Sequence, residues 1–334
     1  MEPLRFGSLG AARISENALI SPSRVTGDRL VAVAARDRGR AEEYAQKHGF
    51  ERVLDDYQAV IDDPEVEVVY NPLANGLHAP WNLRAVAAGK HVLAEKPYAS
   101  NAEEARLVRD AAAEAGVHVV EAFHYRYHPV QKRMIELAGS GEIGDVVYVE
   151  ARMLMPPPAA GDLRWDFGVA GGGLMDVGCY AVHGLRDLAG LLGGEPAVLS
   201  ARAGEIPASP GIDAWLAADL AYPSGVPAHI ETSMTHGVWD FSLRIVGSKG
   251  EAYAPAFVLP QTDDRVVVTV GTEQRVEELG RRPTYTYMLE ALRRLVRAGE
   301  PMVTDADDAV VTMGIIDDIY LAAGMPLRPV TTID

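Results

Sequence analysis

Gly7-Ser8-Leu9-Gly10-Ala11-Ala12-Arg13-Ile14 is the stretch of this chain that decides its fold. It comes after a short apolar segment typical of a buried strand, and a helical pattern follows it. Gly7 and Gly10 let a backbone approach a pyrophosphate closely, and Ala12 holds the third position of a G-x-x-G-x-A turn. The N-terminus of the next helix adds free N–H groups and the positive end of the helix dipole. A glycine turn between a strand and a helix therefore predicts dinucleotide binding.

Strands and helices alternate from this turn to about residue 123. Besides the first strand, we predict strands at 30–35, 66–70, 91–94 and 117–121, with helices over 39–48, 78–88 and 101–115. Helices of about ten residues or more between short apolar strands indicate βαβ units and a parallel sheet covered on both faces. The sequence thus predicts an α/β chain whose first domain, residues 1–123, has a Rossmann fold.

The end of the second predicted strand indicates which dinucleotide is bound. An enzyme that uses NAD usually has Asp or Glu here, which bonds the ribose 2′-hydroxyl. This chain has Ala34-Ala35-Arg36-Asp37, so Ala35 takes the carboxylate position. The Arg36 guanidinium suits a 2′-phosphate, and Arg40 lies one helical turn later. We therefore expect NADP, with NAD still possible because Asp37 could face a 2′-hydroxyl.

Two other strand ends carry polar groups. Pro97 must stop or bend the strand at 91–94, which leaves Lys96 at the carboxyl edge where open α/β sheets bind ligands. Asn71-Pro72-Leu73-Ala74-Asn75 follows the neighbouring strand, and Asn75 could hold the nicotinamide ribose. His78 opens the next helix, a position where a helix cap is a more common role than catalysis.

The second half of the chain has a different pattern. We predict strands at 146–153, 198–203, 214–221, 228–235, 241–246, 251–253 and 265–270, and helices over 129–138, 174–188, 285–298 and 306–323. Consecutive strands joined by short turns indicate a mostly antiparallel sheet. We expect residues 124–334 to form one α+β domain for substrate binding and oligomerisation. An open face of such a sheet commonly packs on a second subunit, so we expect a homodimer or homotetramer.

The helix predicted over 174–188 carries a second set of polar side chains. Asp176 and Tyr180 are four residues apart and would project from one helical face, with His183 on roughly the same stripe. An ordinary polar face is the alternative. Cys179 lies off this stripe and is expected to be a small core residue.

Composition narrows the class of protein. The net charge of −16 argues against non-specific nucleic-acid binding, which needs a basic surface. No apolar run approaches the ~20 residues of a membrane span, and the first strand begins so early that we expect no signal peptide. The single cysteine and the unclustered histidines favour neither a disulfide nor a metal site. We expect a cytoplasmic protein.

These motifs together resemble the Gfo/Idh/MocA oxidoreductases over nearly the whole chain. The matching segments are 7–14, 34–37, 75–78, 89–97, 121–129 and 171–180, of which Glu95-Lys96-Pro97 after Gly89-Lys90-His91-Val92 is the most specific. The pattern is most similar to the branch of dimeric dihydrodiol dehydrogenases, NADP-dependent xylose dehydrogenases and deoxysugar 3-ketoreductases. The resemblance places Lys96 beside the nicotinamide and implies a cis peptide before Pro97.

The chain also departs from the family pattern. Ala74-Asn75 stands where many members have Pro-Asn, and Tyr180 stands where inositol-dehydrogenase-like members have a histidine. The acid–base assignment of inositol dehydrogenases is therefore not carried over.

The resemblance implies hydride transfer between a secondary alcohol or ketone and the nicotinamide. Tyr180 would transfer the proton, since a neighbouring ammonium such as that of Lys96 favours the phenolate of a group whose ordinary pKa is about 10. Asp176 would hold the substrate hydroxyl or Lys96. The opposite split, with Lys96 as the immediate acid or base, stays open.

The full set of expected site residues follows from these arguments. The expected catalytic residues are Lys96, Tyr180 and Asp176. The expected cofactor residues are Gly7, Leu9, Gly10, Ala11, Ala12, Arg13, Ile14, Arg36, Arg40, Pro72, Leu73, Asn75, His78, Glu95, Lys96, Arg164 and Trp165. The expected substrate residues are His124, Arg126, Trp165 and His183. The polar substrate set suits a sugar, a polyol or a cyclic diol. Two alternatives remain, a lyase or glycosidase that recycles tightly bound NAD and a non-catalytic dinucleotide sensor.

Overall fold

The structure is a computed structural model that describes residues 1–333, and the chain divides into two compact units. Unit 1 comprises Met1–Phe123, Tyr285–Met313 and the segment from Pro329. Unit 2 comprises His124–Thr284 and Gly314–Arg328. The sequence predicted all of 124–334 as one domain, whereas two stretches from this half belong to unit 1 in the structure.

Ion pairs explain why the helix α8 (Thr284–Ala298) belongs almost wholly to unit 1. Arg293 donates to the Thr26 carbonyl at 2.6 Å and pairs with the buried carboxylate of Asp28. Arg297 donates to the Pro3 carbonyl at 2.8 Å and pairs with Glu67. These partners lie far from α8 in the sequence, so no local pattern could have revealed them.

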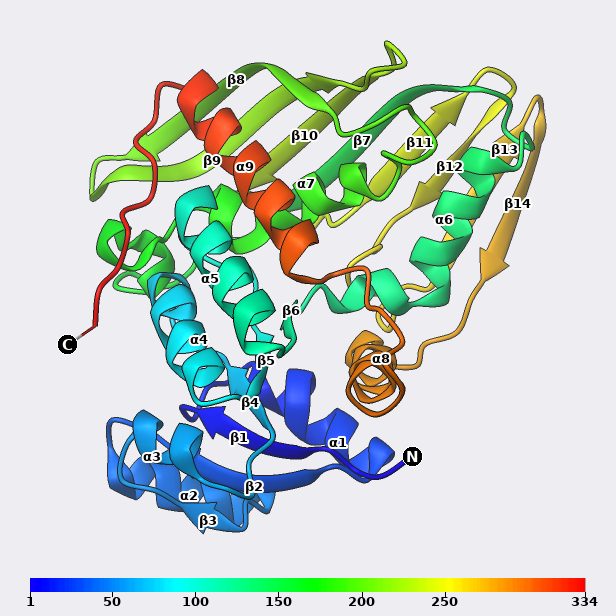
Figure 1. Ribbon diagram of the computed structural model, residues 1–334. Coiled ribbons are helices and arrows are strands. Elements are labelled where there is room, and N and C mark those ends of the chain that lie inside the picture. Colours follow the sequence, from blue (N-terminus) through cyan, green and yellow to red (C-terminus); the bar gives the residue numbers. More distant parts are fainter. Residues whose placement is uncertain (334) are drawn as a thin grey trace. The chain divides into compact units, whose positions relative to one another are not determined.

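Unit 1 is built on a parallel six-stranded sheet in the order β3-β2-β1-β4-β5-β6 (Figure 1). The strands are β1 (Arg5–Leu9), β2 (Arg29–Ala34), β3 (Arg52–Val53), β4 (Val68–Asn71), β5 (His91–Ala94) and β6 (Val119–Glu121). Every neighbouring pair is parallel. The order changes direction at β1 and β4, so the ligand crevice of a Rossmann fold is expected at their carboxyl ends.

Helices connect these strands. They are η1 (Glu16–Ile20), α1 (Ser21–Thr26), α2 (Arg38–His48), α3 (Tyr57–Asp62), η2 (Asn75–Leu77), α4 (His78–Ala87) and α5 (Ala102–Ala115). A later helix, α9 (Ala306–Ala322), begins in unit 1 and ends in unit 2. The first helix differs from prediction because its opening turn, η1, is a π-helix. The short elements β3 and α3 were not predicted.

Unit 2 contains an eight-stranded sheet in the order β14-β13-β12-β11-β7-β10-β9-β8. Its strands are β7 (Val146–Leu154), β8 (Ala197–Ile206), β9 (Ser209–Ala221), β10 (Pro227–Ser233), β11 (Leu243–Gly247), β12 (Gly250–Ala254), β13 (Arg265–Val270) and β14 (Glu273–Glu278). Only β10 and β7 pair in parallel among the described strands of this sheet. The predicted mostly antiparallel sheet is confirmed, and β14 is an addition to it.

Helices and short turns pack on this sheet. They are η3 (His124–Tyr127), α6 (Pro129–Gly139), η4 (Leu163–Trp165), η5 (Phe167–Val169), η6 (Leu174–Gly178) and α7 (Cys179–Arg186). The predicted helix over 174–188 is interrupted, because its first five residues form the π-helix η6. α6 contacts β12 and β13, and α7 contacts β7 and β10. Cys179 is buried, as expected of a core residue.

Candidate active site

The glycine stretch formed by the end of β1 and the turn after it requires both of its glycines. A Cβ atom on Gly7 would lie 2.6 Å from Val60 and 2.9 Å from Val66, closer than packed atoms allow. Gly10 has a φ of 105°, which L side chains rarely adopt, and its amide donates to the Ala34 carbonyl at 2.8 Å. The turn therefore fits the pyrophosphate of a dinucleotide.

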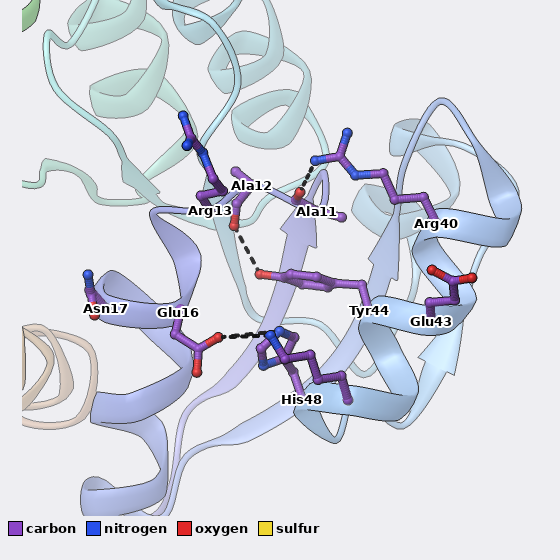
Figure 2. A pocket seen from close by; sticks show the side chains of 10 residues that line it. Ala11, Ala12, Arg13, Glu16, Asn17, Arg40, Glu43, Tyr44 and His48 are labelled. Carbon is purple, nitrogen blue, oxygen red and sulfur yellow. Dashed lines mark hydrogen bonds and ion pairs between the residues drawn. The ribbon is translucent and has the colours of Figure 1, made fainter. Parts of the chain in front are cut away.

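Two side chains of α2 donate hydrogen bonds to this turn (Figure 2). The Arg40 guanidinium donates to the Ala11 carbonyl at 2.6 Å, and the Tyr44 hydroxyl donates to the Ala12 carbonyl at 3.2 Å. These groups line a pocket of about 520 Å³, whose other lining residues are Arg13, Glu16, Asn17, Glu43, Lys47 and His48. Burial raises the pKa of the Tyr44 phenol, so this side chain stays a neutral hydrogen-bond donor. Sequence reasoning missed Tyr44, although its spacing of four from Arg40 places both on one face of α2.

The loop after β2 has one carboxylate, and that carboxylate caps a helix. Asp37 is the N-cap of α2, and its Oδ1 accepts from the Arg40 amide at 2.7 Å. This is the ordinary capping role of aspartate. Arg36 lies beside it with its side chain exposed.

The loops after β4 and β5 are joined by His78. Its Nδ1 lies 2.7 Å from the Pro97 carbonyl oxygen and its Nε2 lies 2.9 Å from the Leu73 carbonyl oxygen. Burial lowers the pKa of this imidazole to about 4, although the two carbonyl contacts act in the opposite direction. Burial has the larger effect on this pKa, since the ring is 1% exposed. His78 thus fixes the ends of both loops.

The segment around Lys96 is held on both sides. The preceding residue, Glu95, is buried and accepts a hydrogen bond from the Tyr70 hydroxyl at 2.9 Å. The Lys96–Pro97 peptide bond is cis, as the resemblance implied. A Cβ built on Gly10 would approach Leu73 to 3.3 Å, so the loops after β1 and β4 adjoin at one edge of the sheet. Pro72, Leu73 and Asn75 all belong to this edge, with Asn75 beginning η2.

In unit 2, Asp176 forms an ion pair with Arg164. The Arg164 Nε lies 2.5 Å from the Asp176 carboxylate, and its Nη1 lies 3.1 Å from that of Asp162. Burial opposes the charged guanidinium, but the two carboxylates outweigh it and raise the pKa of Arg164. The neighbouring Trp165 directs its Nε1 toward the Pro158 carbonyl at 3.4 Å. Asp176 lies in the π-helix η6, so the α-helical spacing assumed between it and Tyr180 does not hold.

The buried ring of Tyr180 lies beside His124. Tyr180 is 6% exposed on α7, and its hydroxyl lies 3.2 Å from the Nε2 of His124, which is 1% exposed. The structure therefore joins one predicted catalytic residue to one predicted substrate residue.

His183 and Arg126 belong to a neighbouring polar cluster. The His183 Nδ1 lies 2.6 Å from the Tyr125 hydroxyl, which also donates to Asp187 at 3.3 Å. Arg126 forms an ion pair with the same carboxylate. Sequence reasoning missed Tyr125 and Asp187, although Asp187 lies four residues after His183 on the same helical stripe.

Membrane-spanning helices and metal-binding clusters are both absent from residues 1–333. None of the helices within residues 1–333 is long and apolar enough to cross a membrane. Over the same residues, no group of three or more His, Cys, Asp or Glu side chains is arranged to hold a metal ion.

Models of known protein families match a segment of each unit. Residues 4–123 match the family described as oxidoreductases with an NAD-binding Rossmann fold, and residues 131–253 match the GFO/IDH/MocA C-terminal domain. D-xylose 1-dehydrogenase (NADP(+)) 2 of Haloferax volcanii is 36% identical over 324 residues, which is 96% of this chain and 97% of the relative. The chain belongs to the Gfo/Idh/MocA oxidoreductase family. It is thus an NAD(P)-dependent oxidoreductase with a Rossmann domain.

Two further known proteins are similar to this chain. Trans-1,2-dihydrobenzene-1,2-diol dehydrogenase of Mus musculus is 35% identical over 254 residues, covering 75% of this chain and 74% of that one. A crystal structure of a 3-ketoreductase from Actinomadura kijaniata with NADP and TDP-benzene aligns with a TM-score of 0.88 at 27% identity, covering 96% of this chain and 98% of that one.

Proposed function

We propose that this oxidoreductase transfers hydride between a secondary alcohol or ketone of a sugar, polyol or cyclic diol and a nicotinamide, with NADP preferred over NAD. The observation that carries the cofactor preference is the Asp37 cap. Because the Asp37 carboxylate accepts the Arg40 amide, it is engaged at the start of α2. The exposed Arg36 guanidinium then suits a 2′-phosphate better than a 2′-hydroxyl.

The proposed chemistry combines a hydride transfer with a proton transfer. When bound, the nicotinamide supplies the acceptor for the hydride that leaves the alcohol carbon. Tyr180 takes the hydroxyl proton as a phenolate, and Lys96 orients the substrate oxygen and favours that phenolate. The ion pair of Asp176 with Arg164 offers a polar surface for further substrate hydroxyls. His78 fixes the loop that carries Lys96.

The substrate class is inferred from the named activities of the relatives and from the polar residues of unit 2. The relatives named above act on D-xylose, on a dihydrobenzenediol or as a 3-ketoreductase. These activities share a hydroxylated ring or its ketone. We also propose a cytoplasmic homo-oligomer that associates through the sheet of unit 2, where Trp215 on β9 is 42% exposed.

Absorbance at 340 nm tests the proposal. The purified protein is incubated with NADP and a panel of free aldoses, inositols and cyclic diols, and with NADPH and keto-sugars in the reverse direction. We expect NADPH to form with at least one member of the panel. No net reduction with any alcohol, together with NAD released from the denatured protein, would instead support a lyase or glycosidase that recycles its cofactor.

A further inference from the structure

The hydrogen bond between His124 and Tyr180 is the least expected contact of unit 2. The His124 Nε2 and the Tyr180 hydroxyl are 3.2 Å apart, and both rings are at least nine-tenths buried. The ring centroids lie 5.7 Å apart with an edge-to-face interplanar angle of 65°, so packing and the hydrogen bond constrain the same pair.

We propose that His124 is a positioning residue for Tyr180, with its Nε2–H donating to the phenol oxygen. This inference rests on the proposed role of Tyr180 in proton transfer. A phenol oxygen that accepts one hydrogen bond can still donate its own proton, so the Tyr180 O–H remains directed to the substrate oxygen. When the phenolate forms, the same N–H stabilises its negative charge.

His124 keeps the same protonation state throughout the proposed proton transfer. In alcohol oxidation the substrate O–H bond breaks and its proton passes to the Tyr180 phenolate, while the carbon loses hydride to the oxidised nicotinamide. The products are the ketone, the reduced nicotinamide and the neutral phenol. His124 neither gains nor loses a proton in this sequence, because its Nε2–H donates both before and after the transfer.

Other titratable groups lie around this pair and must be considered in any pH profile. The Tyr125 ring packs against Tyr180 with centroids 5.9 Å apart, and its hydroxyl contacts His183 and Asp187. The charge of Asp187 is matched by Arg126, and Asp176 is paired with Arg164. The His124 Nε2 contacts the phenol oxygen of Tyr180 itself, so replacement of His124 is expected to act on that oxygen directly.

The test compares the pH dependence of kcat/KM for alcohol oxidation in three proteins. His124→Leu removes the N–H donor, whereas the amide of His124→Gln can place an N–H close to the original Nε2. We expect the rising limb of the His124→Leu profile to move up by about one pH unit, so that kcat/KM at neutral pH falls about tenfold while the high-pH plateau recovers. His124→Gln should restore most of the wild-type profile, and the dissociation constant of NADPH should stay unchanged in both variants.

Controls separate this inference from simpler explanations. His229→Gln replaces a histidine of β10 that pairs with Asp219 on β9, and it should leave the profile unchanged. If His124→Leu does not fold, His124→Asn removes the contact, because its shorter amide falls short of the phenol. An equal loss of kcat/KM at every pH, with no movement of the rising limb, would overturn the inference and leave the proposed function intact. Full activity of Tyr180→Phe would instead overturn the role of Tyr180 in proton transfer, and this inference with it.

Discussion

The hydroxyl of Tyr180 is the atom on which the proposed proton transfer depends. Replacing Tyr180 by phenylalanine removes that atom and keeps the ring that packs on Tyr125 and His124. Since positioned proton transfer contributes typically 10²–10⁴-fold, we expect kcat to fall by at least about 100-fold. NADPH affinity, measured by fluorescence titration, should stay within about twofold. Turnover near the wild-type level would assign proton transfer to another group, with Lys96 the first candidate.

His78 makes the stability of unit 1 depend on pH. The pKa of its buried imidazole is lowered to about 4 from an ordinary value of 6.5. The folded state therefore resists the proton that the unfolded state binds, so the contribution to stability is present above pH 6.5 and is lost as the pH falls toward 4. Between pH 7.5 and 5 this group should reduce the free energy of unfolding by roughly 2 kcal/mol.

Urea unfolding at these two pH values checks the prediction. Burial also lowers the pKa of His128 to about 4, so the wild-type difference contains more than one histidine. The comparison with His78→Gln isolates the first contribution, and His118→Gln is the control, because His118 is exposed. An identical pH dependence in wild type and His78→Gln would show that His78 is not the group responsible.

At this scale the sequence identified residues but not their partners. Arg36, Lys96 and Tyr180 could be selected from residue types and predicted elements, because these are local features of the sequence. They could not show that the Asp37 carboxylate is engaged in a helix cap, or that His124 meets Tyr180 across 56 residues. Those contacts follow from the folding of separate elements against one another.

The glycine stretch formed by the end of β1 and the turn after it is the element on which the proposed pyrophosphate contact depends. Gly7→Ala places a Cβ within 2.6 Å of Val60 and should destabilise the protein by about 1–3 kcal/mol, as overpacking of a close-packed core does. Gly39→Ala in α2 meets only ordinary contacts and should leave stability unchanged or slightly raised. Thermal unfolding of both variants checks this. A Gly7→Ala protein as stable as wild type would mean that Val60 can shift at little cost.

Elements with a clear hydrophobic period were predictable, and the exceptions have physical causes. The strand β14 consists of Glu273-Gln274-Arg275-Val276-Glu277-Glu278, which has no apolar alternation because it is an exposed edge strand. The π-helices η1 and η6 carry the same residue types as α-helices, so composition cannot distinguish them.

Across the whole chain, a buried charge pair ties a late segment to the middle of unit 2. Arg328 and Asp213 are fully buried and lie 2.6 Å apart, with the Tyr320 hydroxyl donating to the same carboxylate at 2.9 Å. Arg328→Met leaves that carboxylate without its charge partner and should cost about 3–5 kcal/mol. The double variant Arg328→Met, Asp213→Asn should be less destabilised, because no uncompensated charge remains. Thermal denaturation that finds the double variant no more stable than Arg328→Met would contradict this reading.

At the scale of the molecule, the sequence predicted the two architectures, a parallel sheet followed by a mostly antiparallel one. It did not predict that α8 belongs to unit 1, since the ion pair of Arg293 with Asp28 joins residues 265 positions apart. Long-range pairing of this kind leaves no periodic signal in either segment.

The most direct test of the account is the ratio of kcat/KM for NADP to that for NAD with one alcohol substrate, in wild type and in Arg36→Ala. Arg106→Ala is the matched control, because Arg106 is exposed on α5 of the same unit. The account predicts a wild-type ratio of at least about 10 and no change of that ratio in Arg106→Ala. In Arg36→Ala the ratio should fall roughly tenfold or more through weaker binding of NADP, because a charge-assisted bond to phosphate contributes about 1.5–3 kcal/mol. A wild-type preference for NAD, or a ratio unmoved by Arg36→Ala, would contradict it.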